Sequence, residues 1–222
     1  MRVVAIVVAG GQGTRVGGER PKALLEVAGR TLLGHAVAAL AEASRVDGVL
    51  PVLPAGTELP ADAATAKSLP PVPGGTERQD SVAAGVNALP DTAEWVAVHD
   101  AARALVRPAA IDRVVEAAQS HGAALLAVPV ADTLKRVEGT RVVESPPRES
   151  FWAAQTPQVF RVELLREALD KARAEGRQGT DCAQLVAALG VPVEIVEGDR
   201  DNWKITYPED LEAAGRILGE RA

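Results

Sequence analysis

The N-terminal segment constrains the fold more than any other part of the sequence. Residues 2–8 are mostly β-branched and apolar, and Ala9, Gly10 and Gly11 follow them directly. An apolar run of this kind predicts a strand that is buried on both faces, and the glycines predict that a loop ends it. This arrangement is typical of the start of an α/β nucleotide-binding fold.

Strand-like and helix-like segments alternate along the rest of the chain. Apolar residues at helical spacing predict a helix from Thr31, a suitable N-cap, to Glu42, and Pro108 marks the first turn of another helix at 108–120. This alternation predicts a mostly parallel sheet flanked by helices on both faces. The further elements that we expect are strands at 49–53, 72–73, 95–98, 123–128 and 191–196, and helices through 82–89, at 161–175, at 180–189 and after Pro208.

One segment interrupts the alternation. Charged residues alternate with valines around Glu138 and Gly139, and Ser145, Pro146 and Pro147 follow. This pattern predicts a projecting β-hairpin arm at about 130–150. The chain of 222 residues, 47% of them hydrophobic, can otherwise bury a sizeable core, and we expect a single domain over residues 1–222 that includes the arm.

Charge and aromatic content argue against two classes of nucleic-acid-binding protein. The 24 lysines and arginines against 30 acidic residues give a net charge of −6, which is the wrong sign for a protein that coats nucleic acid. An aromatic content of 3% disfavours base-stacking platforms for single strands. An anionic ligand would therefore have to bind in a local basic pocket.

Cysteine content and the N-terminus predict a cytoplasmic protein with no membrane association. Cys182 is the only cysteine, so no intramolecular disulfide can form, as expected in a reducing compartment. The apolar run at the N-terminus is too short to span a bilayer and ends in glycines instead of a cleavage site.

The glycine loop after the first strand is suited to binding phosphate. Glycines let the backbone approach a phosphate closely, and Arg15 and Lys22 add positive charge. The dinucleotide-binding fingerprint does not fit, because it would need glycine at Val16. A Walker-type loop does not fit either, because Glu19 follows Gly18 where a lysine is required.

The sequence Gly10-Gly11-Gln12-Gly13-Thr14-Arg15, with Pro21-Lys22 beyond it, resembles the signature loop of sugar-phosphate nucleotidyltransferases. Six further motifs follow in the order seen in the 2-C-methyl-D-erythritol 4-phosphate cytidylyltransferase family, and the resemblance covers essentially the whole chain. These motifs are Gly74-Gly75-x-x-Arg78-x-x-Ser81-Val82, His99-Asp100-Ala101-Ala102-Arg103, Asp132-Thr133-x-Lys135-Arg136, Gln155-Thr156-Pro157-Gln158, Thr180-Asp181 and Asn202-x-Lys204-x-Thr206.

The resemblance implies a Rossmann-like nucleotidyltransferase fold and a role for each motif. The family transfers CMP from CTP to 2-C-methyl-D-erythritol 4-phosphate and releases pyrophosphate, in non-mevalonate isoprenoid precursor synthesis. Three basic residues would surround the reacting α-phosphate as the catalytic set: Arg15, Lys22 and Lys204. Nucleotide binding would involve Ala9, Gly10, Gly11, Gly13, Thr14, Gly74, Gly75, Thr76, Arg78, Ser81, Ala101 and Ala102. The acceptor would be bound by Asp100, Arg103, Thr133, Arg148, Thr156 and Thr180.

The resemblance also implies a homodimer and a metal cofactor. In the family an arm from one subunit completes the pocket of the other, so Thr133 and Arg148 would grip the acceptor phosphate across the interface. Mg²⁺ would be bound mainly through the CTP phosphates, with no dedicated set of protein ligands. Two positions depart from the family pattern: Ala104 stands where proline is usual and Cys182 where glutamate is common. We expect both to alter loop stiffness or polarity without loss of activity.

Three alternatives remain open from the sequence. A ribitol 5-phosphate cytidylyltransferase would share the nucleotide half and differ only in the acceptor pocket and arm. An enzyme for a purine nucleotide would need a base pocket unlike the turn at 75–81. A catalytically silent CTP-binding regulator would not need the full basic set of Arg15, Lys22 and Lys204.

Overall fold

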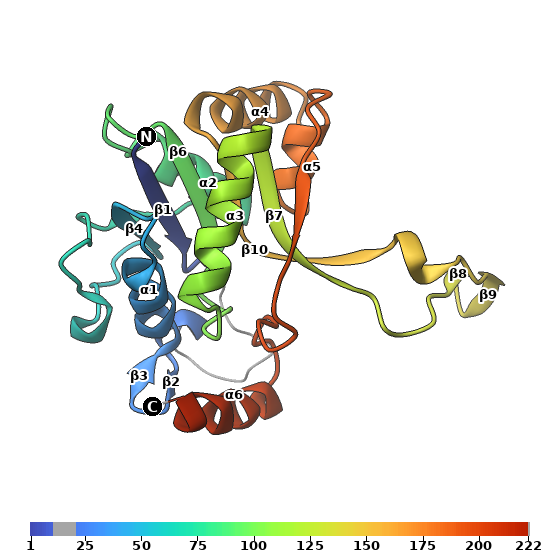
Figure 1. The fold of residues 1–222 in the computed structure, drawn as a ribbon, viewed down its shortest axis with the longest axis horizontal. Coiled ribbons are helices and arrows are strands. Elements are labelled where there is room, and N and C mark those ends of the chain that lie inside the picture. The colour runs from blue at the N-terminus through green and yellow to red at the C-terminus, as the bar shows by residue number, and fades with distance from the viewer. Residues whose placement is uncertain (11–20, 222) are drawn as a thin grey trace.

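A seven-stranded sheet forms the centre of the protein, in the strand order β11-β7-β10-β6-β1-β4-β5 (Figure 1). The computed structural model describes residues 1–10 and 21–221. β1, the predicted N-terminal strand, is buried at every position. The strands are β1 (Val3–Val8), β4 (Gly48–Leu53), β5 (Val72–Pro73), β6 (Trp95–Asp100), β7 (Ala123–Pro129), β10 (Trp152–Arg161) and β11 (Glu194–Glu197).

The sheet is mostly parallel, as predicted. β1 pairs in parallel with β4 and β6, β4 with β5, and β7 with β11. β10 is the exception, because it runs antiparallel to both of its neighbours, β6 and β7. The sequence pattern predicted no element at residues 152–161, where the structure has β10.

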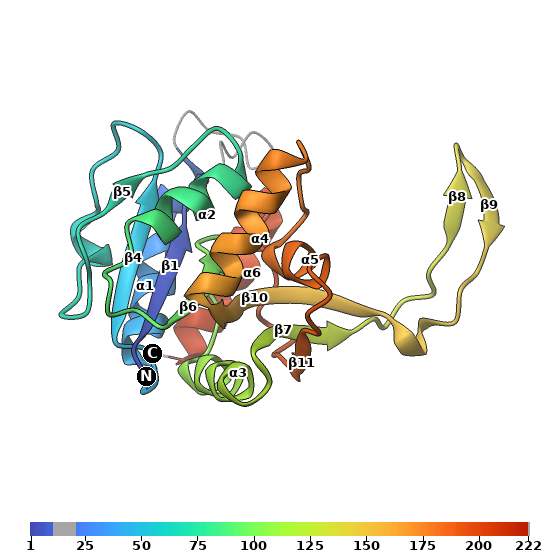
Figure 2. The same ribbon diagram turned by 90° about the horizontal axis from the view of Figure 1, so that it is seen from above.

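Helices cover both faces of the sheet, which confirms the predicted layers (Figure 2). Alternate side chains of β1 divide between two hydrophobic clusters: Val3, Ala5 and Val7 pack with α1 and α3, whereas Val4, Ile6 and Val8 pack with α2, α4 and α5. The period-2 alternation of a strand explains this division. The helices are α1 (Leu32–Glu42), α2 (Arg78–Asn87), α3 (Pro108–His121), α4 (Val162–Ala174), α5 (Cys182–Ala187) and α6 (Pro208–Arg221).

Local signals placed most helix ends correctly. The Thr31 side chain accepts a hydrogen bond from the Gly34 amide at 2.9 Å and caps α1, and Pro108 begins α3. α5 is shorter than the predicted helix at 180–189, because the Asp181 side chain accepts from the Gln184 amide and fixes the first turn after Asp181. The strand predicted at 191–196 begins three residues later in the structure, as β11 at Glu194–Glu197, where it pairs with β7.

The predicted arm is a hairpin that extends away from the sheet (Figure 1). β8 (Arg136–Glu138) pairs antiparallel with β9 (Arg141–Glu144), and the turn between them contains Gly139 at a φ of 59°. Every residue of these two strands is exposed. The arm connects β7 to β10, which explains why β10 returns beside β7 in the opposite direction.

A small subdomain lies below the sheet in the view of Figure 1. β2 (Glu26–Val27) and β3 (Arg30–Thr31) form a short hairpin next to α6, and a hydrophobic cluster joins Val27 and Leu32 to Ile205 and Ala214. This packing brings the C-terminal segment back to the residues that follow the glycine loop. Across residues 1–10 and 21–221, no helix is both long enough and apolar enough to cross a membrane.

Candidate functional site

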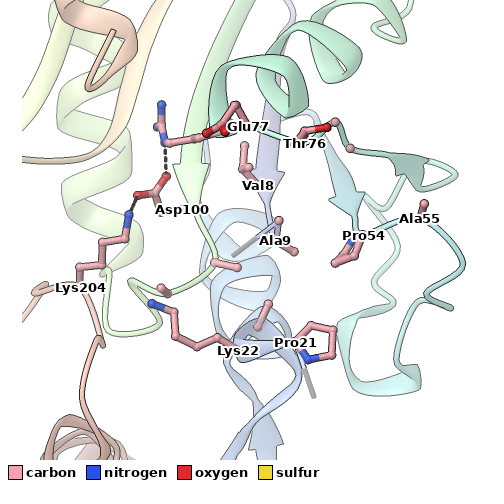
Figure 3. Close-up of a pocket in the computed structure, with 17 residues that line it drawn as sticks. Val8, Ala9, Pro21, Lys22, Pro54, Ala55, Thr76, Glu77, Asp100 and Lys204 are labelled. Atoms are coloured by element: carbon pink, nitrogen blue, oxygen red, sulfur yellow. Dashed lines mark hydrogen bonds and ion pairs between the residues drawn. The ribbon is translucent and has the colours of Figure 1, made fainter. Parts of the chain in front are cut away.

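A cleft of about 920 Å³ opens at the carboxyl ends of β1, β4 and β6 (Figure 3). In the sheet, β4 lies on one side of β1, and β6, which comes later in the chain, lies on the other side. Such a reversal of strand order leaves a crevice in which α/β proteins bind ligands. The predicted site residues that line this cleft are Ala9, Gly10, Lys22, Gly74, Gly75, Thr76, Arg78, Asp100, Ala101, Ala102 and Lys204.

Two glycines let the turn before α2 pass close to the helix. A Cβ atom on Gly74 would lie 2.7 Å from Ser81 Oγ, and one on Gly75 would overlap the Asp80 Cβ. Ser81 is buried, and its hydroxyl oxygen accepts a hydrogen bond from the Gly75 amide at 3.2 Å. The turn at 74–76 is therefore held against the first turn of α2 with its backbone at the cleft wall.

Asp100 links two cations at the back of the cleft. Arg78 Nε donates to Asp100 Oδ1 at 2.9 Å, and Lys204 Nζ donates to Asp100 Oδ2 at 2.8 Å (Figure 3). Burial alone would raise the pKa of the Asp100 carboxyl, but the charges of Arg78 and Lys204 outweigh it and hold that pKa well below its ordinary range. Burial would likewise lower the pKa of Arg78, but the Asp100 charge raises it. Asp100 and Arg78 are therefore both charged at neutral pH.

A hydrogen-bond relay fixes the loop that bears Asp100. His99 Nε2 lies 3.2 Å from the Arg103 carbonyl oxygen, which can only accept, so this nitrogen carries the proton. Nδ1 then accepts from the Thr156 hydroxyl at 3.0 Å, and the Thr156 oxygen accepts from the Asp100 amide at 3.1 Å. Burial lowers the pKa of His99 to about 4, so the ring stays neutral near pH 7.

The C-terminal segment is tied to the same loop. Arg103 Nη1 donates to the Asn202 carbonyl at 2.8 Å, and the Ile205 amide donates to the Ala102 carbonyl at 2.8 Å. Lys22 Nζ donates to the Ile205 carbonyl at 2.7 Å. These contacts bring Lys22 and Lys204, which lie 182 positions apart in the chain, to the same cleft.

Other predicted site residues lie away from this cleft or outside the described residues. Thr156 lies behind Asp100, and Thr180 precedes α5, where its hydroxyl donates to Gln184 Oε1 at 3.2 Å. Thr133 and Arg148 belong to the arm, and Arg148 Nη1 donates to the Ala131 carbonyl. Gly11, Gly13, Thr14 and Arg15 lie outside the described residues.

Several residues at the site were not assigned a role from the sequence. Cys182 Sγ lies 3.7 Å from Arg78 Nη1, and burial raises the pKa of this thiol, so it stays protonated. The buried amide of Asn202 donates to Gln155 Oε1 at 3.2 Å and to the Thr156 carbonyl at 3.0 Å. The side-chain amides of Gln155 and Gln158, within a mostly apolar stretch at 152–161, could have indicated these contacts, because buried polar side chains need hydrogen-bond partners.

Comparison with known proteins identifies one family. A family model described as IspD, 2-C-methyl-D-erythritol 4-phosphate cytidylyltransferase, matches residues 3–220. A protein of that name from Deinococcus radiodurans is 46% identical over 218 residues, covering 98% of this chain and 90% of its own. One from Desulforamulus reducens is 41% identical over 226 residues, covering 99% of this chain and 97% of its own.

A solved structure leads to the same family. The crystal structure of 2-C-methyl-D-erythritol 4-phosphate cytidylyltransferase from Thermus thermophilus superimposes with a TM-score of 0.83 at 42% identity, and the match covers 99% of this chain and 100% of that one. The family model, the relatives and this structure each match nearly the full chain. The chain belongs to the 2-C-methyl-D-erythritol 4-phosphate cytidylyltransferase family.

Proposed function

We propose that this protein transfers CMP from CTP to 2-C-methyl-D-erythritol 4-phosphate, giving 4-diphosphocytidyl-2-C-methyl-D-erythritol and pyrophosphate. The observation that carries the proposal is the meeting of Lys22, Lys204, Asp100 and the turn at 74–76 in one cleft of a chain that belongs to this family. The reaction is a step of non-mevalonate isoprenoid precursor synthesis. We place it in the cytoplasm, as the single cysteine led us to expect.

The chemistry suits a site that is rich in fixed positive charge. The nucleophile is an oxygen of the acceptor phosphate, which is already ionised at neutral pH, so no side chain has to remove a proton. The reaction must instead overcome repulsion between two anions and stabilise charge on the oxygens around the α-phosphorus. Lys22 and Lys204 supply this stabilisation, and Arg15 is expected to join them.

We assign the nucleotide and the acceptor to different walls of the cleft. The turn at 74–76 is suited to recognition of the cytosine edge, because its backbone groups line the cleft. The hydrogen bond from the Gly75 amide to the Ser81 hydroxyl holds this turn at a fixed distance from α2. Ala101 and Ala102 follow β6 and offer a small-residue surface for the ribose. Asp100 is placed to accept from the hydroxyls of the acceptor, with Arg103 close behind it in the same loop.

Mg²⁺ is the proposed cofactor, bound mainly through the triphosphate. The residues present fit this mode. Both oxygens of the Asp100 carboxylate already accept hydrogen bonds, one from Arg78 and one from Lys204, so the ion would depend on the triphosphate for most of its ligands. When bound, the ion neutralises phosphate charge and keeps much of its water shell. Lys22 and Lys204 would contact the phosphate oxygens directly.

We also propose a homodimer in which the arm of each subunit reaches the acceptor site of the other. Val137, Val142 and Val143 of the arm are 52%, 58% and 42% exposed, and Phe151 and Trp152 at its base are 42% and 38% exposed. A two-stranded hairpin with exposed apolar side chains gains stability by packing against another surface. Such packing would bring Thr133 and Arg148 to the phosphate of the acceptor.

The test is pyrophosphate release from CTP and Mg²⁺ with two acceptors offered in parallel. We expect turnover with 2-C-methyl-D-erythritol 4-phosphate to exceed turnover with D-ribitol 5-phosphate. The opposite preference would assign the protein to ribitol phosphate activation and leave the nucleotide half of the proposal intact. CTP binding without pyrophosphate release for either acceptor would indicate a regulator instead of an enzyme.

A further inference from the structure

The contacts of Asp100 are divided between two cations from different parts of the chain. One carboxylate oxygen accepts from Arg78 and the other from Lys204. We propose that Arg78 is a positioning residue, which keeps Asp100 paired and in place when Lys204 leaves it to bind the substrate phosphates. The inference rests on the proposed function, because it takes Lys204 as a ligand of the nucleotide.

Arg78 is the partner that stays. It belongs to the first turn of α2, its side chain is 27% exposed, and its guanidinium reaches both Asp100 and Cys182 Sγ. Lys204 lies in an irregular segment, and its side chain is 43% exposed. A planar guanidinium with several donors keeps a fixed orientation, whereas an ammonium on a flexible stem can turn to a new partner.

Charge explains why the second cation is needed. The Asp100 side chain is only 11% exposed, and a buried carboxylate without a partner is strongly destabilising. If Lys204 were its only partner, moving the lysine to a phosphate would leave such a carboxylate behind. With Arg78 in place the carboxylate remains paired, so the departure of Lys204 costs less free energy.

The same argument predicts what Arg78 does to nucleotide affinity. Asp100 and the phosphates compete for Lys204, and Arg78 weakens the hold of Asp100 by sharing its charge. Removal of Arg78 strengthens the Asp100–Lys204 pair and therefore weakens binding of Mg²⁺-CTP. A direct contact between Arg78 and the nucleotide would also weaken binding when lost, but that effect would not depend on Asp100.

A double-mutant cycle separates these explanations. The dissociation constant of Mg²⁺-CTP is measured by titration calorimetry for the wild type, Arg78→Gln, Asp100→Asn and the double variant. We expect Arg78→Gln to weaken binding by about ten-fold in the wild-type background, within the range of coupling between contacting charged groups. In the Asp100→Asn background we expect the same substitution to change binding by less than about two-fold.

Three further measurements make the result decisive. Arg45→Gln removes an arginine that pairs with Glu116 on the surface and serves as the matched control. Arg78→Lys keeps the charge, so its binding is expected between those of the wild type and Arg78→Gln, and thermal unfolding of each variant verifies that it folds. An equal loss of affinity in both Asp100 backgrounds, or no loss at all, overturns the proposal. Pyrophosphate release by the wild type tests the proposed function separately, because the binding cycle does not require turnover.

Discussion

The cleft and the arm differ in how their residues are held. In the cleft, Asp100 ends a fully buried strand, and its loop is tied by His99 and Thr156 to the neighbouring β10. In the arm, β8 and β9 are exposed throughout, and the ion pairs of Arg136 with Glu138 and Glu144 lie on its surface. Such exposed pairs contribute little stability.

In the proposed site, the two regions would achieve their geometry in different ways. The sheet of a single chain positions the residues that are proposed to bind the nucleotide, and its closely packed core leaves them little freedom to move. The arm residues Thr133 and Arg148 have no core beneath them, so their position depends on whatever surface the arm contacts. The proposed site, which combines both regions, would therefore be complete only when the arm is docked.

The largest effect is expected for a lysine of the cleft. Lys204→Ala removes a donor to the phosphates and should lower turnover by about 100- to 1000-fold, as loss of one preorganised donor does in other enzymes. Steady-state pyrophosphate release measures it. Lys171→Ala, on the exposed side of α4, is the matched control. Turnover within about two-fold of the wild type would remove Lys204 from the catalytic set.

The next largest effect tests whether the arm acts across subunits. Arg148→Ala should lower kcat/KM for the acceptor by about 10- to 100-fold, the range for a hydrogen bond to a charged group, and leave the affinity for CTP unchanged. Arg141→Ala on β9 is the control for loss of a charge from the arm.

Mixing the two impaired variants gives the sharper result. In a heterodimer of Lys204→Ala and Arg148→Ala subunits with exchanged arms, one site contains neither substitution. An equal mixture that exchanges subunits should then recover about a quarter of the wild-type activity. If each arm served its own subunit, no site in the mixture would be intact and the activity would stay at the level of the separate variants.

The sequence predicted those parts of the fold that depend on local signals. The cap at Thr31, the proline that begins α3 and the turn at Gly139 each needed only neighbouring residues, and each is present. β10 was missed because Gln155, Pro157 and Gln158 interrupt its apolar pattern. The glutamine side chains find their partners far away in the sequence: Gln155 donates to the Asp199 carbonyl, and Gln158 donates to the Asp181 carboxylate.

The site shows the same limit. The motifs located Lys22, Gly74, Asp100 and Lys204, and the sheet brings these residues to one cleft. The contacts among them were not predictable, because Arg78 and Asp100 are 22 positions apart and Asp100 and Lys204 are 104 positions apart. No periodicity links such positions, so only the tertiary fold reveals that Asp100 is shared between two cations.

A smaller effect should follow from breaking the relay behind Asp100. Thr156→Val keeps the shape of the side chain but removes the oxygen that accepts from the Asp100 amide and the hydroxyl that donates to His99. Leaving buried polar groups without partners costs about 1–3 kcal/mol, or about 2–10 °C in the unfolding temperature of a chain of this size. Thr156→Ser keeps the oxygen and should lose less. Equal losses in both variants would mean that packing of the methyl group matters more than the relay.

The smallest effect at neutral pH concerns His99, because its ring is neutral in both the folded and the unfolded chain at pH 7. Burial lowers its pKa to about 4, below the ordinary value of 6.5, so between these values the unfolded chain binds a proton that the folded chain does not. The stability from the neutral ring is thus complete above pH 6.5 and is lost as the pH falls toward 4. Burial also lowers the pKa of His35, which contributes in the same direction.

Unfolding by urea between pH 7 and pH 4 measures this loss. His99→Asn should flatten the pH dependence of the unfolding free energy. His35→Asn measures the share of the half-buried ring on α1. An unaltered slope in the His99 variant would show that acid destabilises the protein through other groups. A flattened slope would assign the acid sensitivity to the buried imidazole next to the Asp100 loop, a group that residues 130–150 of the arm lack.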